Sequence, residues 1–443
     1  MPPARDQPRP PARPWRRSAA LAALVALASL AAVGPRAAPA QAPAPAPPAA
    51  PPAPAALPPW SPGTLDLHQI STGEGNAALF VLPDGTTLLV DAGDAGGRVP
   101  GAPPVPDGSR RAGEWIARYV LHMLAGSPSP RLDYALLTHF HSDHMGSAGP
   151  EAPRSPAGGY GLSSITNVAK GLPIGTLIDR GWPDYSYPAP LTGAGIAAMD
   201  NYLAFLLWQR EHRGLTVERA RPGAADQVRL LRDPEIYPGF EVCVVVVNGE
   251  VWTGDGAATE RRFPALAGVL WADRPGENMC SIALQMRYGP FSYYTGSDLP
   301  GVPDDGAPAW WDVETPVARA LGPTDVVVVD HHGSIDPASP FFLATTRPRV
   351  LILPTWAPGH PAPVVLKRLL NERIYPGPRD LFATRIRPST REVIGPRIDR
   401  LAADHGHVVV RVEPGGGSYR VFVLDDEDAS YRVLAVYGPY SAE

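Results

Sequence analysis

The chain has 443 residues, of which 44% are hydrophobic and 19% charged, with a formal net charge of −5 at pH 7. This length suits one large domain or two small ones, and it is sufficient to bury a sizeable hydrophobic core. Residues 1–62 hold 18 of the 56 prolines and six arginines against one aspartate, a balance of +5 that leaves −10 for residues 63–443. An acidic body argues against a broad nucleic-acid-binding surface.

Residues 1–40 have the pattern of a signal peptide. A basic segment ending in Arg16 and Arg17 precedes the uncharged run SAALAALVALASLAAV, and Ala38 and Ala40 fit an A-x-A-type cleavage site. The apolar run is short for a membrane span. We therefore expect a secreted bacterial protein, periplasmic or extracellular. The arginine pair leaves the twin-arginine route open, and an uncleaved signal anchor, the only membrane contact we expect, is the alternative.

Residues 41–62 consist almost wholly of Ala and Pro, which favour an extended spacer, so we expect the fold to begin near Gly63. The two cysteines, Cys243 and Cys280, lie in separate apolar runs, and the sequence leaves their pairing open. Since they lack the spacing of a metal site, histidine and carboxylate would be the ligands of any bound metal.

The body alternates strand-like and helix-like segments. Turn residues 83–85 predict a β-hairpin, and apolar spacing in 114–126 predicts a helix, as it does for 195–213 and 363–373. Further strands are expected at 132–139, 174–180, 241–247, 281–288, 291–297, 325–332 and 349–356. We expect one domain over 63–402 with sheets covered by helices. Residues 403–443 read as a short C-terminal β extension packed on it.

The strongest chemical signal is THFHSDHMG, directly after the apolar run LDYALL. Alternating side chains would direct His139 and His141 to one metal, and Asp143 and His144 could reach a second. The alternative is a polar loop with coincidental histidines. However, five of the 11 histidines lie in this motif and in HHGS at 331–334, where a metal site would need them.

The HxHxDH motif resembles that of the metallo-β-lactamase superfamily, and further segments resemble its ComEC-like branch, the soluble hydrolase domain of a DNA-uptake competence protein. The resemblance covers roughly residues 65–370 and rests on GEGNAALFVLPDGTTLLVDAG, THFHSDHMGS, ENMCSIALQMRYGPFSYYTGSDLPG, DVVVVDHHGS and GHPAPVVLKRL. It implies an α/β (α+β) fold, a four-layered αββα sandwich with the metals at one edge of the paired sheets.

The resemblance also assigns residues to the site. Asp298 matches the carboxylate that bridges two metals, and HHGS supplies the last ligand of the Asp143/His144 metal, with His332 favoured over His331. The other histidine of this pair would then support the ligands or contact substrate. His360 matches a position that contacts the anionic group of the substrate, unless it is an ordinary loop histidine. Asp91 resembles a structural aspartate beneath the site.

One ligand of the His139/His141 metal is missing from the pattern. Many members with two metals have a further histidine before the bridging aspartate, but His212 is the only histidine between residues 145 and 297, and it lies in a helical pattern. Asp179, at the end of an apolar run, is the better candidate, followed by Asp184. The implied cofactor is Zn²⁺, as two ions, with Mn²⁺ or Fe as alternatives; one metal instead of two remains open.

The expected reaction is hydrolysis by metal-bound hydroxide, with Asp143 orienting it or accepting its proton. A phosphodiester or related phosphorylated substrate is favoured by the ComEC-like resemblance. A β-lactam or lactone is the nearest alternative, and an exported, non-catalytic binding module on the same fold is the alternative of another class. The loops at 149–195 and 249–275 are expected to line the pocket and to choose the substrate. The oligomeric state stays open.

Overall fold

The computed structural model describes residues 54–443, except for 127–129, 150–151, 192–193 and 303–305. The predicted signal peptide and most of the predicted linker lie outside the described residues. The end of that linker belongs to the fold: Ala56 pairs with Arg432, and the guanidinium of Arg411 donates a 2.7 Å hydrogen bond to the carbonyl of Pro58. The fold therefore begins before Gly63.

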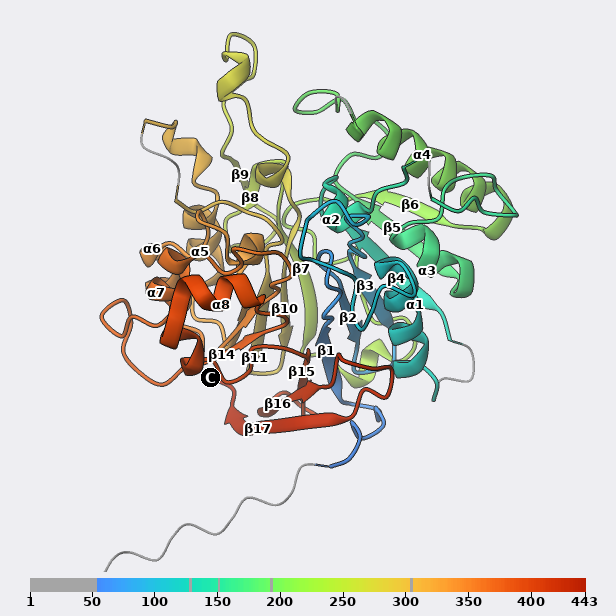
Figure 1. Cartoon of the computed structure of the whole chain (residues 1–443). Helices are drawn as coiled ribbons and strands as arrows, with labels where there is room; N and C mark the ends of the chain where they lie inside the picture. Colours follow the sequence, from blue (N-terminus) through green and yellow to red (C-terminus); the bar gives the residue numbers. More distant parts are fainter. Residues whose placement is uncertain (1–53, 127–129, 150–151, 192–193, 303–305) are drawn as a thin grey trace, which may run out of the picture. The chain divides into compact units, whose positions relative to one another are not determined.

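The first sheet has nine strands in the order β17-β16-β15-β1-β2-β3-β4-β5-β6 (Figure 1). Neighbours from β17 to β3 run antiparallel, whereas β3, β4, β5 and β6 run parallel. The strands are β1 (Leu65–Gln69), β2 (Ala78–Val81), β3 (Thr87–Val90), β4 (Leu132–Leu137), β5 (Ile174–Asp179), β6 (Thr216–Arg219), β15 (His407–Val412), β16 (Ser418–Leu424) and β17 (Val433–Ser441).

The second sheet has eight strands in the order β14-β13-β12-β11-β10-β7-β8-β9. Here β11 to β14 run parallel and the remaining pairs antiparallel. The strands are β7 (Phe240–Val247), β8 (Glu250–Trp252), β9 (Thr259–Arg261), β10 (Ala283–Tyr288), β11 (Phe291–Thr295), β12 (Val326–Val328), β13 (Val350–Leu353) and β14 (Asp380–Ala383).

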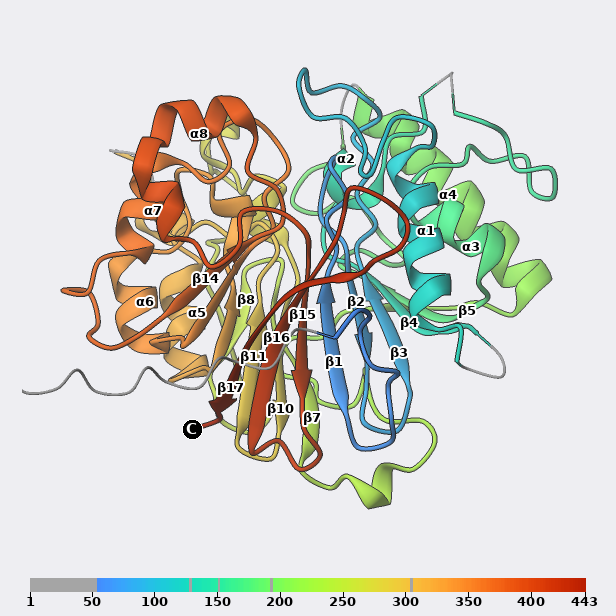
Figure 2. The ribbon, with the colours of Figure 1, turned by 60° about the horizontal axis from the view of Figure 1, so that its bottom comes forward.

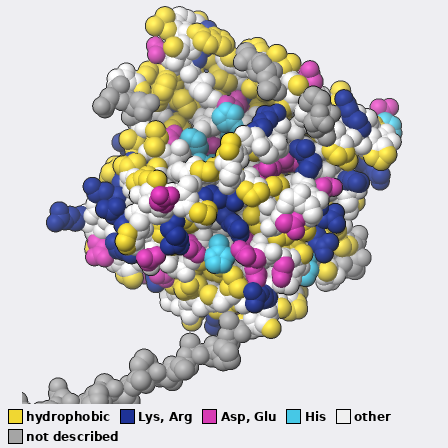
Figure 3. Space-filling view, in the orientation of Figure 1, with side chains coloured by type: hydrophobic (Ala, Val, Ile, Leu, Met, Phe, Trp, Pro, Cys, Tyr) yellow, Lys and Arg dark blue, Asp and Glu magenta, His cyan; other side chains and the backbone are white. Residues whose placement is uncertain are grey.

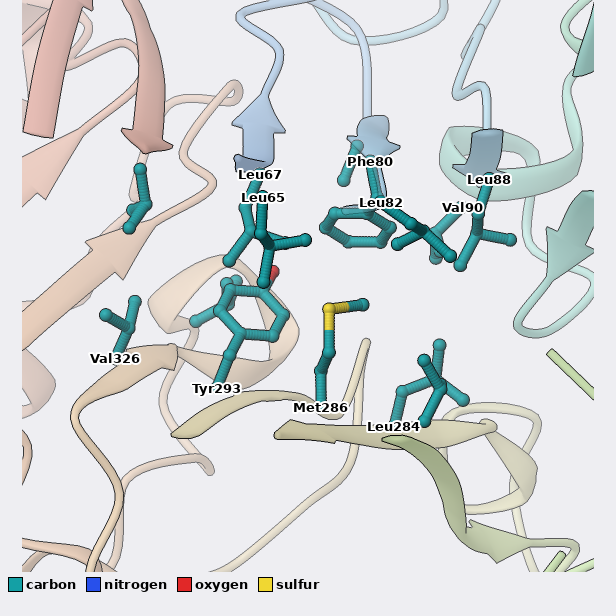
Figure 4. Close-up of a cluster of buried hydrophobic side chains, with 14 of the residues drawn as sticks. Leu65, Leu67, Phe80, Leu82, Leu88, Val90, Leu284, Met286, Tyr293 and Val326 are labelled. Carbon is teal, nitrogen blue, oxygen red and sulfur yellow. The ribbon is translucent and has the colours of Figure 1, made fainter. Parts of the chain in front are cut away.

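The two sheets pack face to face on a shared apolar core. Alternate residues of the strands point between the sheets, as the two-residue period of a strand requires. Figure 4 shows Leu67 and Phe80 of the first sheet facing Met286 and Tyr293 of the second, and the rings of Phe80 and Tyr293 meet edge to face at 5.7 Å. Complete burial of such a side chain stabilises the fold by about 1.5–3 kcal/mol.

Helices cover the outer face of each sheet (Figure 2). Buried residues of α1, α3 and α4 share an apolar cluster with the first sheet, and buried residues of α5 to α8 share another with the second. The helices are α1 (Ala112–Met123), α3 (Ile165–Gly171), α4 (Ala194–Arg213), α5 (Glu314–Leu321), α6 (Pro340–Thr346), α7 (Pro363–Leu369) and α8 (Pro388–Ile394). The predicted αββα arrangement is confirmed.

The C-terminal segment differs from the prediction of a packed extension. Strand β15 lies between β16 and β1, so the segment forms three strands of the first sheet itself. Val408, Val410 and Val412 point into the core between the sheets. The two cysteines, Cys243 and Cys280, are both buried and free. Among the described helices, none has the length and apolar character needed to cross a membrane.

Candidate metal centre

The predicted ligands gather at the edge of the sandwich where the parallel strands of both sheets end. The motif 139–144 follows β4 and continues into the short helix α2 (Ser142–Met145), while Asp298 follows β11 and His332 follows β12. Neighbouring parallel strands bring their carboxyl ends to one edge, so side chains distant in sequence meet there. In the side of the molecule drawn in Figure 3, histidine and carboxylate side chains lie next to one another in the upper part of the surface.

One group of potential ligands consists of Asp143, His144, Asp298 and His332, whose ligand atoms all lie within 4.8 Å of one another. Asp298 Oδ1 is 3.2 Å from His144 Nε2 and 3.5 Å from His332 Nε2. Asp143 Oδ2 is 3.1 Å from His332 Nε2. Two imidazoles and two carboxylates form a donor set of the kind that binds Zn²⁺.

A second group consists of His139, His141 and Asp298. His139 Nε2 lies 3.1 Å from His141 Nδ1 and 3.7 Å from Asp298 Oδ2. Asp298 thus presents one carboxylate oxygen to each group, which places it between the two candidate sites.

The unsatisfied polar atoms of this cluster match a bound cation. Asp298 Oδ1 is buried and has no hydrogen-bond partner among the described residues. His144 Nε2 and His332 Nε2 face each other at 3.3 Å, although each ring already uses its other nitrogen in a hydrogen bond. Buried polar atoms normally have partners. A divalent metal ion held by Asp143, His144, Asp298 and His332 would satisfy these atoms, so the residues of this group fit a metal that the family resemblance implies.

Surrounding residues orient the imidazoles. The Nδ1 of His144 donates to the carboxylate of Asp91 over 2.8 Å, and the Nδ1 of His332 donates to the carbonyl of Pro354 over 3.0 Å. The Asp91 carboxylate also accepts hydrogen bonds from Thr138. Because Nδ1 is occupied, each ring turns its Nε2 towards the ligand group, an arrangement that raises metal affinity.

The backbone near the ligands is strained. Asp91, Ser297, His331 and His332 adopt φ values of 56°, 56°, 44° and 55°. Such left-handed conformations are uncommon outside glycine, cost of order 1–3 kcal/mol each, and cluster at functional sites. The surrounding hydrogen bonds therefore hold the loops after β3, β11 and β12 in conformations that the isolated segments would avoid.

Charge interactions keep the carboxylates in the ionised state that metals require. Burial by itself would raise the pKa of Asp298, but the adjacent imidazoles of His144 and His332 hold that pKa well below its usual range. Burial, together with the charge of His144, lowers the pKa of His139. The ligand cluster therefore combines ionised carboxylates with at least one neutral imidazole.

His331 lies beside the two groups and belongs to neither. Its Nδ1 donates to Asp336 over 2.7 Å, while its Nε2 is 3.9 Å from Asp298 Oδ2 and 3.0 Å from the Nδ2 of Asn278. Burial opposes protonation, but the hydrogen bond to Asp336 and the charge of Asp298 raise the pKa of His331 to about 9. The structure therefore gives His332 a place in a ligand group and His331 a place next to it.

His360 packs against a ligand. Its ring is stacked on that of His332, with centroids 5.1 Å apart, and meets Trp356 edge to face. Burial, with the charge of His332, lowers the pKa of His360 to about 3, so the ring is neutral at pH 7. Its Nδ1 is buried and has no partner among the described residues. The predicted contact with an anionic substrate group stays a prediction.

The structure does not bring the predicted extra ligands to the site. The carboxylate of Asp179 is buried and accepts four hydrogen bonds, from the backbone of Gly181 and Trp182 and from the hydroxyls of Tyr185 and Tyr202. Both oxygens of this carboxylate accept hydrogen bonds, so Asp179 stabilises the loop after β5. The prediction of a ligand role for Asp179 is therefore corrected. The weaker candidates lie elsewhere too: His212 stacks on Trp208 at the surface, and Asp184 caps an exposed turn.

A buried ion pair, which the sequence did not reveal, supports the His139/His141 loop. Arg180, which is 1% exposed, donates to both carboxylate oxygens of Glu277. Glu277 also accepts a 2.8 Å hydrogen bond from the backbone N–H of Phe140, between the two histidines. Arg180 follows β5 in the first sheet and Glu277 precedes β10 in the second, so the pair ties the two halves of the site together.

Comparison with known proteins agrees with this geometry. The family model of the metallo-beta-lactamase superfamily matches residues 71–194, which include the motif 139–144. No curated protein matches the chain.

Among solved structures, the chain is similar to Zn²⁺-bound PqqB from Methylobacterium extorquens, with a TM-score of 0.33, 11% identity, and 76% of this chain and 87% of that chain covered. It is also similar to the short form of human tRNase Z, with a TM-score of 0.28, 13% identity, and coverage of 65% and 91%. The family match thus places a segment of the metallo-β-lactamase superfamily at residues 71–194, and the two covered sheets and the two ligand groups that share Asp298 accord with that match.

Proposed function

We propose that the protein is an exported, zinc-dependent phosphodiesterase of the ComEC-like type. The observation that carries the proposal is the position of Asp298, whose two carboxylate oxygens face two separate ligand groups. Paired metals a few ångströms apart suit displacement at phosphorus, because such a pair would stabilise both the attacking and the leaving oxygen of the phosphodiester. Imidazole and carboxylate donors without thiolate suit Zn²⁺ and leave Mn²⁺ and Fe as alternatives.

Bound zinc would supply Lewis acidity and lower the pKa of a coordinated water from 15.7 to about 7. The residues of the chain supply the rest. Asp143 lies within 3.1 Å of His332 and orients the attacking water or accepts its proton. His331, which Asp336 holds through Nδ1, has its Nε2 3.9 Å from Asp298 Oδ2, and its ring contacts the reacting group in this proposal. Asp336 is in this proposal a positioning residue for His331.

Export is proposed from residues 1–40 alone, whose basic segment, apolar run and small-residue site form a signal-peptide pattern. The proposed location is the periplasm or the extracellular space. N-terminal sequencing of protein recovered from periplasm and medium tests this: a mature chain beginning near Gln41 supports export, whereas a chain retained whole in the cytoplasm contradicts it.

The catalytic proposal is tested by metal analysis of the purified protein together with a panel of bis(p-nitrophenyl) phosphate, DNA, a β-lactam and a lactone. We expect bound zinc and phosphodiester turnover, both reduced in His141→Ala and Asp298→Ala. His212→Ala is the matched control, because that histidine lies at the surface outside both ligand groups. It should retain metal and activity.

Two outcomes would overturn the proposal in different ways. Turnover of the β-lactam or lactone without the phosphodiesters would replace the substrate class and keep the metal centre. Absence of bound metal, with no turnover of any substrate after zinc is added, would favour the non-catalytic binding module.

A further inference from the structure

A cavity separate from the two ligand groups opens where the edge strands of the two sheets come together. Its volume is about 820 Å³, and it lies between the end of β6 in the first sheet and the segment containing β8 and β9 in the second. Figure 1 labels β6, β8 and β9 in the upper part of the molecule, where α2 also lies. The residues that line it and matter here are Tyr187, Arg219, Arg221, Asn248, Arg261 and Phe263.

The wall of this cavity carries excess positive charge. Arg219 ends β6, Arg221 follows it, and Arg261 ends β9, so both sheets contribute guanidinium groups. Arg221 pairs with Asp226, whereas no carboxylate among the described residues lies within 4.0 Å of Arg219 or Arg261. The one acidic residue in the lining, Glu250, accepts a hydrogen bond from Thr259 instead.

The wall that holds these arginines also contains Tyr187. Burial raises the pKa of Tyr187, and the positive charges of Arg261, Arg180 and Arg219 oppose that rise. Three guanidinium groups therefore lie within electrostatic range of the Tyr187 side chain. Tyr187 lines the cavity, where its hydroxyl can donate a hydrogen bond to a ligand. Guanidinium groups bind phosphate oxygens in pairs of parallel hydrogen bonds, which suits such a site to a phosphate.

Hydrogen bonds connect the cavity wall to the metal centre. Arg180 donates to the carbonyl of Tyr187 over 2.9 Å and to the side chain of Asn248 over 3.2 Å, and both residues line the cavity. The same guanidinium binds Glu277, which accepts the N–H of Phe140 between the metal-ligand histidines. The cavity and the metal centre thus lie on opposite sides of one buried arginine, at the same end of the parallel strands.

We infer that this cavity is a subsite for a second phosphate of the substrate, adjacent to the phosphodiester that is hydrolysed. The inference rests on the proposed function, because it assumes a substrate with several phosphates, such as an oligonucleotide. Arg219, Arg261 and the Tyr187 hydroxyl bind the phosphate, and Phe263 offers an apolar face to the attached nucleoside. A local basic cavity reconciles a polyanionic substrate with an acidic protein.

The test compares the intact chain with the double variant R219Q/R261Q. Its matched control, R397Q/R400Q, removes the same two charges from exposed positions outside the cavity. Binding of a fluorescein-labelled phosphorothioate oligothymidylate is measured by anisotropy, and kcat/KM is measured for an oligothymidylate and for bis(p-nitrophenyl) phosphate. The single variant R261Q, at the end of an edge strand, serves if the double variant unfolds.

We expect R219Q/R261Q to weaken oligonucleotide binding, and to lower kcat/KM for the oligothymidylate, by about tenfold or more, because each lost charged hydrogen bond is worth about that factor. Turnover of bis(p-nitrophenyl) phosphate, which has a single phosphate, should stay within about twofold, as should every value for the control. Equal binding and equal kcat/KM for wild type and R219Q/R261Q would overturn the subsite while leaving the phosphodiesterase intact. Oligonucleotide binding that depends on these arginines, without any phosphodiester turnover, would keep the subsite and overturn the proposed function.

Discussion

Glu74 lies close to a second carboxylate beside the loop that carries the metal ligands. Its Oε1 accepts the backbone N–H of Gly97, and the neighbouring Asp94 is held by both nitrogens of an Arg111 fork. Burial, together with the negative charge of Asp94, raises the pKa of Glu74 to about 7 from an ordinary value of 4.5. Below that pH the folded protein holds the neutral acid, which can donate a hydrogen bond to Asp94.

This shift predicts a pH-dependent stability. Because the pKa is higher in the folded than in the unfolded state, the stabilisation by neutral Glu74 is complete below pH 4.5 and is lost as the pH rises to about 7. The loss amounts to at most about 3 kcal/mol. Glu74→Gln keeps the neutral donor at every pH. Urea unfolding should therefore show a gain in stability for this variant at pH 8 and little difference at pH 4.5; a constant difference across this range would refute the assignment.

The site residues that the sequence could assign stand in recognisable motifs. His139, His141, Asp143 and His144 stand in one motif, so their spacing alone predicted a site. Asp336 and Asn278, which contact His331, have no such spacing, and only the fold shows that they reach it. Asp179 shows the opposite error: a suitable residue at a strand end proved to be committed to hydrogen bonds of its own loop.

At the scale of elements, the Arg180–Glu277 pair joins the end of β5 to the segment before β10. The pair spans the two sheets at the edge where the ligands gather, and Glu277 also fixes the backbone of Phe140. Removing one member of a buried pair leaves the other charge without a partner, which is more costly than replacing both members with apolar side chains.

Arg180→Met should lower the free energy of unfolding by about 3–5 kcal/mol in urea titrations, because Glu277, whose side chain is only 10% exposed, would lose its charge partner. The double variant R180M/E277M should recover part of this loss. Arg391→Met, which removes exposed ion pairs to Asp399 and Asp404, is the control and should change stability by about 1 kcal/mol or less. The single variant Glu277→Met completes the comparison. If the losses in unfolding free energy of Arg180→Met and Glu277→Met simply added in R180M/E277M, the two residues would not act as a pair.

At the scale of the whole molecule, the last strands of the chain complete the first sheet. β15 pairs with β1 on one side and β16 on the other, and its valines fill the core between the sheets. The N-terminal strand of the domain is therefore stabilised by residues more than 300 positions later. The first sheet thus continues from residues 63–402 into the C-terminal strands.

Val410→Asp tests this closure. Val410 is 0% exposed, so an aspartate there would bury a charge without a partner and should abolish cooperative unfolding and metal binding. Val393→Asp, at a position on α8 that is 74% exposed, should leave both unchanged. Circular dichroism and metal content decide the outcome. Retention of bound metal in Val410→Asp would mean that the segment is the separable extension that its sequence suggests.

By itself, the sequence determined the class of the fold and the chemistry of the centre. Alternating apolar runs, turn residues and the HxHxDH motif are local patterns, and local patterns follow from the two periods of strand and helix and from the ligand preferences of metals. Strands and the ligands within motifs could be predicted because these patterns are local. The neighbours of each strand and the residues that contact the ligands could not, because they are distant in sequence.

Only the tertiary structure decided which residues meet. It showed that Asp179 is engaged in its own loop, brought Asn278 and Asp336 to His331, and inserted β15 into the first sheet. It also brought Arg219 and Arg261 from two sheets to one cavity. These contacts join residues tens to hundreds of positions apart, and they depend on strand order and packing, which no periodicity in a single chain encodes.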